Sequence, residues 1–102
     1  MCVEYKRKPK ELNFLISGEI DEFSAPKTRA VLDKIIDENT DVGSVVFDLT
    51  NVGFMDSTGI GMFIGRYKKL QKFGIPVYIS GTSASVEKVF SLSGIYKLMP
   101  KK

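Results

Sequence analysis

An acidic residue followed by two hydroxyls, Asp56-Ser57-Thr58, is the part of this sequence most suited to chemistry. Asp56 fits the N-cap of a helix, because its carboxylate can accept hydrogen bonds from the free N–H groups of the first turn. Ser57 and Thr58 then occupy the first helical positions, near the positive end of the helix dipole. That position suits a phosphate, bound or covalently attached. Taken alone, however, Ser57 is more readily explained as an ordinary first-turn serine.

Glycines follow these hydroxyls at positions 59, 61 and 65. Each glycine costs the interior of a helix about 0.5–1 kcal/mol relative to alanine, so some other requirement must justify them. At about 100° per residue, Gly61, Gly65 and Met62 lie opposite the expected core face. Bare backbone beside an exposed methionine favours a surface that another protein approaches closely. The alternative is that these glycines and Gly59 admit a neighbouring loop of the same chain.

The 102 residues suffice for one domain with a modest core, which we expect to span residues 1–102. The sequence has no apolar run near the ~20 residues of a membrane span, and it begins without the apolar stretch of a secretory signal. A single cysteine, Cys2, excludes an internal disulfide. These features favour the cytoplasm and give no reason to expect a membrane partner.

Histidine, the commonest general base at neutral pH and the commonest metal ligand, is absent. Cys2 therefore has no histidine to activate it as a nucleophile. Catalysis would have to use carboxylates and lysines alone. We accordingly expect no enzyme activity, no metal and no cofactor.

The net charge of +3 is unevenly distributed, with +2 over residues 1–18, −6 over residues 19–56 and +7 over residues 57–102. A basic domain invites a nucleic-acid interpretation. Here the basic residues are scattered, and no basic groove interleaved with aromatic residues is apparent. We expect solvated faces and no direct nucleic-acid partner. Arg66 and Lys69 are expected to be solvated or to be used by a protein partner.

The elements around the motif predict an α/β domain. Strands at residues 3–8 and 11–18, joined by a turn at Pro9-Lys10, form an antiparallel hairpin. The remaining expected elements are a helix from the Ser24 N-cap to about Asn39, a strand at 44–49, the motif helix to about 73, a strand at 75–80, a helix capped by Ser83 at 84–92 and a short edge strand at 96–99. The apolar run 44–49 is typical of a central strand covered on both faces. Together they predict a mixed sheet of four to five strands with three main helices.

Helical periodicity predicts which side chains of these helices face the core. The predicted sets are, in chain order, Ala30, Val31, Ile35 and Ile36; Ile60, Phe63, Ile64, Tyr67 and Leu70; and Val86, Val89 and Phe90. Open α/β sheets place their sites at the carboxyl ends of strands, where the loops after strands 11–18 and 44–49 both emerge. We therefore expect Asp21 and Asp56 to share this edge with Ser57.

The run VVFDLTNVGFMDSTGIG, residues 45–61, resembles the signature of the STAS domain. Three further segments agree with this family in order: GEID at 18–21, GRY at 65–67 and FSLSGI at 90–95. The similarity spans nearly the whole chain and is weakest in the first strand. More narrowly, the sequence is similar to free-standing bacterial anti-sigma factor antagonists of the sporulation or general-stress type.

This resemblance implies a partner switch. The unphosphorylated antagonist binds an anti-sigma factor that is also a serine protein kinase, and the sigma factor is released. The kinase phosphorylates the serine that follows the motif aspartate, which is Ser57 here with Thr58 as a secondary candidate, and a metal-dependent phosphatase reverses the modification. Asp21 and Asp56 match the acidic positions that flank the phosphosite. The expected partner-binding surroundings of Ser57 are Asp21, Asp56, Thr58, Gly59, Gly61, Met62 and Gly65.

Two other functions compete with the antagonist hypothesis. A nucleotide-binding STAS protein in another partner-switching system would use the glycine-containing helix start to cradle a phosphate. The sequence lacks the Walker-type Gly-Lys-Ser/Thr run that such binding commonly uses. A nucleic-acid-binding domain is suggested by the basic isoelectric point alone.

Overall fold

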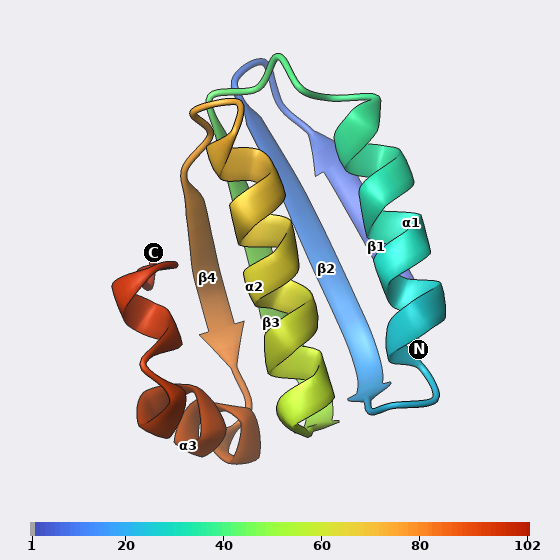
Figure 1. Cartoon of the computed structure of the whole chain (residues 1–102), viewed down its shortest axis with the longest axis vertical. Coiled ribbons are helices and arrows are strands. Elements are labelled where there is room, and N and C mark those ends of the chain that lie inside the picture. Colours follow the sequence, from blue (N-terminus) through green and yellow to red (C-terminus); the bar gives the residue numbers. More distant parts are fainter. Residues whose placement is uncertain (1) are drawn as a thin grey trace.

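The computed structural model describes residues 2–102, which form one sheet with three α-helices (Figure 1). The elements in chain order are β1 (Cys2–Arg7), β2 (Glu11–Ile20), α1 (Ala25–Asp37), β3 (Ser44–Met55), α2 (Ser57–Gln71), β4 (Val77–Thr82), α3 (Ala84–Ser93) and the 3-10 turn η1 (Ile95–Lys97).

The four strands lie in the order β1-β2-β3-β4. β1 is antiparallel to β2, whereas β2, β3 and β4 are parallel, so α1 and α2 serve as the crossovers that parallel neighbours require. The predicted α/β class and N-terminal hairpin are confirmed. β3 continues past the predicted end at residue 49 because it stays paired with β2 as far as Ile20 and Met55.

The core lies between one face of the sheet and the helices α1 and α2, which run side by side over that face (Figure 1). The prediction that the central strand is covered on both faces is wrong. On the second face Val46 is buried, whereas Asn13, Leu15 and Asp48 are only half-buried. Neither α1 nor α2 lies on that face (Figure 1). The strand order explains this arrangement: the sheet grows in one direction, so crossovers of one hand place both helices on the same side.

Aromatic rings connect the sheet, α2 and the C-terminal elements in one continuous series. Offset or edge-on ring pairs contribute about 0.5–1.5 kcal/mol each beyond their buried area. Neighbouring centroids lie 5.1 to 6.4 Å apart along the series Tyr5, Phe14, Phe47, Phe63, Phe90 and Tyr96. The pair Phe63 and Phe90 connects α3 to α2, and the pair Phe90 and Tyr96 connects η1 to α3.

The core face of α1 differs from the predicted one. Leu32 and Ile36 are fully buried, whereas Ala30 and Val31 are exposed, so that part of the prediction is wrong. Apolar residues stand next to one another at 30–32 and 35–36, so two neighbouring helical stripes fit the pattern equally well. Packing on the sheet selects the stripe formed by Ala25, Thr28, Leu32 and Ile36.

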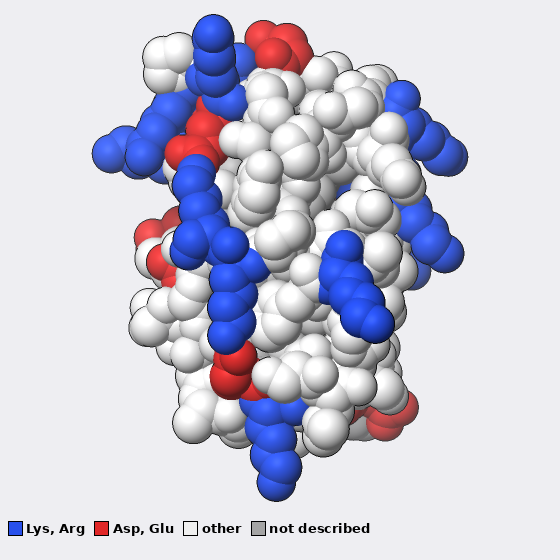
Figure 2. All heavy atoms as spheres, turned by 90° about the vertical axis from the view of Figure 1, so that its left-hand side faces the viewer, with Lys and Arg blue, Asp and Glu red and all other residues white. Residues whose placement is uncertain are grey.

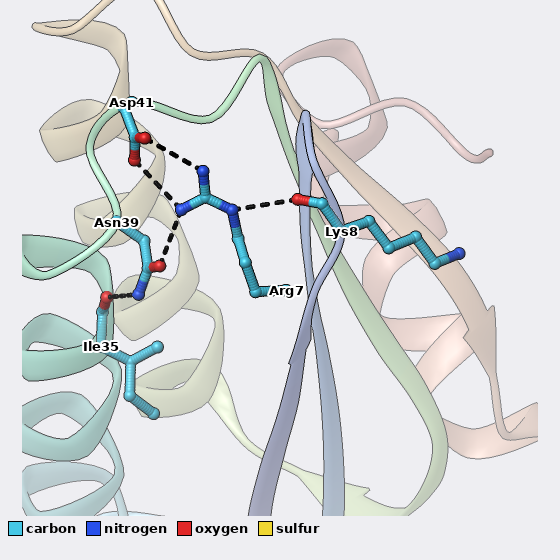
Figure 3. Close-up of polar contacts among 5 residues, drawn as sticks. All are labelled: Arg7, Lys8, Ile35, Asn39 and Asp41. Carbon is cyan, nitrogen blue, oxygen red and sulfur yellow. Dashed lines mark hydrogen bonds and ion pairs between the residues drawn. The ribbon is translucent and has the colours of Figure 1, made fainter.

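An arginine of β1 anchors the end of α1 (Figure 3). Arg7 donates to Asn39 Oδ1 at 2.9 Å and forms two bonds of 3.0 Å with the carboxylate of Asp41. Asn39 in turn donates to the carbonyl of Ile35 at 2.7 Å. The Asp41 carboxylate raises the pKa of Arg7, and the cluster joins β1 to the loop between α1 and β3, at the opposite end of α1 from Asp21.

The predicted edge strand at Tyr96–Met99 is wrong. Gly94 ends α3 with a φ of 76°, and the chain then turns through η1 instead of extending. Only beyond it does the chain meet β4, in a single bridge where Ile79 donates to Pro100 and accepts from Lys102. The sheet therefore has four strands. Figure 2, which looks onto this edge, shows Lys and Arg side chains interrupted by acidic ones around a mostly uncharged area.

Glu87 of α3 holds this C-terminal segment in place. Its carboxylate accepts from Lys101 Nζ at 2.5 Å, from the Tyr96 hydroxyl at 2.5 Å and from Thr82 Oγ1 at 2.7 Å. These donors, first Lys101 and then Tyr96 and Thr82, lower the pKa of Glu87 from its ordinary 4.5 to about 2.

A carboxyl whose pKa is lower in the folded state stabilises the fold above its unfolded pKa and loses that contribution as the pH falls through the folded value. We therefore expect stability to decline as the pH drops from 4.5 to about 2 and Glu87→Gln to flatten this decline. Urea unfolding across this range measures it. Glu22→Gln, in the loop between β2 and α1, is the control and should leave the decline unchanged.

Candidate functional site

The Asp56-Ser57-Thr58 motif lies where β3 ends and α2 begins. Asp56 occupies the N-cap with extended backbone (φ −101°, ψ −173°), and its Oδ1 accepts from the N–H groups of Thr58 at 2.9 Å and Gly59 at 3.3 Å. The predicted cap is confirmed. Ser57 is the first residue of α2, and both hydroxyl residues are exposed. The Ser57 side chain is therefore accessible from the surface.

Removing the Asp56 carboxylate should destabilise the domain by about 1 kcal/mol, because two N–H groups of α2 lose their acceptor. The comparison is Asp56→Ala against Asp56→Asn, whose amide oxygen can still accept. Urea unfolding should show a lower midpoint at unchanged slope for the alanine variant and a smaller change for the asparagine variant. Equal midpoints for Asp56→Ala and the parent chain would contradict the capping role.

Asp21 lies at the same edge of the sheet. Ile20 pairs with Met55, and the N–H of Asp56 donates to the Ile20 carbonyl at 3.2 Å, so the residues that follow the two strands are neighbours. The Asp21 carboxylate accepts from the N–H groups of Ser24 at 2.9 Å and Phe23 at 3.0 Å. These bonds, led by that of Ser24, lower the pKa of Asp21. The expected shared edge is therefore present.

Ser24 precedes α1, but its hydroxyl does not cap the helix as predicted. Its backbone is helical (φ −86°, ψ −27°), and its Oγ accepts from the N–H of Asp21 at 3.0 Å while donating to the Glu19 carbonyl at 2.9 Å. The Ser24 hydroxyl therefore stabilises the loop that contains Asp21. Its hydrogen bonds to the loop backbone take the place of the one it would make as a helix cap.

The three glycines of α2 have different surroundings. Gly59 is buried, and a Cβ there would lie 2.5 Å from Met55 Cγ and 2.8 Å from Ile20 Cγ2, so this glycine admits side chains from the ends of β3 and β2. At Gly61 and Gly65 a Cβ would meet nothing within 4 Å. Contact within the same chain therefore explains Gly59, whereas Gly61 and Gly65 leave open backbone.

Two side chains of α2 are buried where the sequence predicted exposure. Met62 is 6% exposed and belongs to the core, and Arg66 is 9% exposed with its Nε 2.9 Å from Asp33 Oδ1. Both predictions are wrong because α1 packs against this side of α2. Lys69 is also paired, 2.8 Å from Asp37, which raises its pKa. Phe63 and Leu70 are in the core as predicted.

A groove of about 440 Å³ lies between α1 and α2, beside the start of α2. It is lined in part by Thr58, Gly61, Gly65, Arg29 and Arg66, with Met62 also contributing. A second hollow of about 690 Å³ lies on the other side of α1 and includes Asp21 and the exposed Phe23. Sequence reasoning missed Arg29 and expected Arg66 to be solvated or used by a protein partner. Only the packing of α1 on α2 brings the two arginines to this place.

The chemistry open to this site is that of a modifiable hydroxyl with a surface around it. Within residues 2–102 no group of three or more His, Cys, Asp and Glu side chains is arranged to hold a metal ion. In the same part of the chain no helix is long and apolar enough to cross a membrane. An exposed hydroxyl at the positive end of a helix is a suitable acceptor for a phosphoryl group.

The fold and this helix start are those of the STAS domain: residues 3–102 match that family, and the chain belongs to it. Two relatives are an anti-sigma F factor antagonist of Paenibacillus polymyxa, 32% identical over 85 residues (83% of this chain and 72% of that protein), and an anti-sigma-B factor antagonist of Staphylococcus aureus, 31% identical over 97 residues (95% and 88%). The predicted resemblance to anti-sigma factor antagonists is confirmed.

Solved structures agree with the fold. The anti-sigma factor antagonist SpoIIAA in its unphosphorylated form superposes with a TM-score of 0.81 at 24% identity, over 99% of this chain and 88% of that one. The Bacillus cell fate determinant SpoIIAA in its phosphorylated form gives a TM-score of 0.72 at 22% identity, over 99% and 91%. At these identities the likeness concerns the fold.

Proposed function

We propose that this protein is an anti-sigma factor antagonist whose binding is switched by phosphorylation of Ser57. In its unphosphorylated form it binds an anti-sigma factor that is also a serine kinase, and the bound sigma factor is released. The observation that supports this most is the placement of Ser57, exposed as the first residue of α2 directly after the Asp56 cap. The names of its relatives support the same class of activity.

The modification is a phosphoryl transfer. The kinase transfers the γ-phosphoryl group of ATP to Ser57 Oγ: a new P–O bond forms, the bond to the leaving ADP breaks, and the hydroxyl proton is released. The phosphate brings about −1.5 to −2 units of charge. Because the start of α2 favours negative charge, the domain itself should stay folded. A metal-dependent phosphatase would hydrolyse the phosphoserine and restore the hydroxyl.

The switch then acts at the interface. A partner that packs over Ser57 and the open backbone of Gly61 and Gly65 would have to bury the phosphate, which blocks contact and costs desolvation. The neighbouring carboxylates of Asp21 and Asp56 add like-charge repulsion. Thr58 is exposed on the same surface, whereas Met62 is buried. Gly59 allows α2 to pack closely on the ends of β3 and β2.

This site needs no cofactor and no enzyme activity of its own, and we place its action in the cytoplasm, where sigma factors work. The partners are the anti-sigma factor kinase and the phosphatase, with no direct contact to nucleic acid or membrane.

The test is incubation with the cognate kinase and ATP followed by mapping of the modified peptide by mass spectrometry. We expect phosphate on Ser57, or secondarily on Thr58. Ser57→Ala is the matched control and should lose the major product. Phosphate at any residue other than these two would contradict the proposal.

A further inference from the structure

The seam between α1 and α2 has one positive charge without an opposite partner. Asp37 lies 2.8 Å from Lys69, and Asp33 lies 3.4 Å from Lys69 and 2.9 Å from Arg66 Nε. One turn nearer the start of α1, the next charged residue is Arg29, and α2 contains no acidic residue that could face it. Three cations, Arg29, Arg66 and Lys69, therefore lie along a seam with only two carboxylates. The excess positive charge is at the Arg29 end.

The groove at that end contains a second unsatisfied cationic group. Arg66 is 9% exposed, and its Nη1 is buried without a hydrogen-bond partner. Burial lowers the pKa of Arg66, and Arg29 lowers it further by repulsion, while Asp33 opposes both. A buried guanidinium N–H without an acceptor is costly. An anion in the groove would offset the positive charge of Arg66 and Arg29.

We propose that the groove between α1 and α2 is a binding site for a phosphoryl group, held by Arg29 with Arg66 behind it. Arginine presents a planar set of donors that matches phosphate oxygens. The free N–H groups and positive dipole end of α2 add to the attraction. The open backbone at Gly61 and Gly65 leaves room for the oxygens.

Two sources of this group fit the geometry. One is phosphorylated Thr58, because Thr58 lines the groove together with Arg29. Phosphothreonine would form by the same phosphoryl transfer as at Ser57: Thr58 Oγ1 gains the γ-phosphoryl group of ATP, ADP leaves and the hydroxyl proton is released. The other is a free phosphate-bearing small molecule. Ser57 does not line the groove, so its phosphate would stay on the outer surface. This inference rests on the proposed function only in needing a kinase that would phosphorylate Thr58.

The first arm of the test compares the whole chain carrying genetically encoded phosphate on Thr58 with the chain carrying it on Ser57. Titration followed by phosphorus NMR reports the second phosphate pKa, ordinarily about 6. For phosphate on Thr58 we expect this pKa to be lower by about one unit, because the group lies beside an opposite charge. Arg29→Gln should restore the ordinary value. Lys27→Gln, an equal charge change on the other side of α1, should leave it lowered. The Ser57 phosphate should not respond to Arg29→Gln.

The second arm titrates inorganic phosphate into the unmodified protein and follows the amide resonances of Thr58, Gly61 and Gly65. Saturable shifts that Arg29→Gln abolishes and Lys27→Gln retains would identify a free anion as an occupant. A response in the first arm alone would identify phosphorylated Thr58. If neither response depends on Arg29, the proposal is overturned. The mapping of Ser57 by the kinase is independent of this outcome, so the two proposals fail separately.

Discussion

Ser57→Asp should weaken binding of the anti-sigma factor by about 3 kcal/mol, which is more than about a hundredfold in Kd, whereas Ser57→Ala should bind as tightly as the unphosphorylated protein. Ser57 is the first, exposed residue of α2, so neither substitution disturbs the core. The added carboxylate would lie beside Asp21 and Asp56 and would have to be buried by the docking partner.

Calorimetric titration of the anti-sigma factor with each variant measures this difference. Ser57→Asn is the matched control, because it has nearly the shape of aspartate without its charge and should bind between the two. Equal affinity of the aspartate and alanine variants would remove the electrostatic explanation. In living cells Ser57→Ala should hold the sigma factor released regardless of kinase activity, and unaltered regulation would contradict the switch.

Gly59→Ala should destabilise the domain by about 1–3 kcal/mol, although alanine is the better helix former. The new Cβ would lie 2.5 Å from Met55 Cγ and 2.8 Å from Ile20 Cγ2. Both atoms lie in buried side chains, so either these side chains or the start of α2 must shift. A shift of α2 would also displace the Asp56 cap and with it Ser57.

Gly61→Ala provides the matched comparison two residues along the same helix. Its Cβ would meet nothing within 4 Å, so helix propensity should raise stability by up to about 1 kcal/mol. If a partner approaches the bare backbone, the same methyl group should weaken anti-sigma factor binding in a more stable protein. Urea unfolding midpoints, with the calorimetric titration, separate the two effects. A Gly59→Ala variant as stable as Gly61→Ala would contradict the packing argument.

Several features of this protein were predictable because residues close in sequence determine them. The Asp56 cap depends on N–H groups two and three residues away, and the end of α3 at Gly94 depends on a backbone conformation that glycine adopts easily. The N-terminal hairpin and the parallel order follow from short and helical connections, respectively. The shared edge of Asp21 and Asp56 then follows from the topology.

Other features were decided by contacts between elements distant in the chain. Periodicity places Met62 and Arg66 away from the α2 core stripe, yet α1 covers that side and buries both. The stripe of α1 was ambiguous by one residue until the sheet selected Leu32 over Val31.

By itself, then, the sequence determined the family, the order of the elements and the position of Ser57 at a helix start, since these depend on local hydrogen bonds and on motif spacing. Only the tertiary structure decided which face of the sheet is covered, which α2 residues remain open and that Arg29 faces Thr58 across a groove. The reason is physical: burial and charge pairing between helices are set by how the helices pack, and many packings are compatible with the same local pattern.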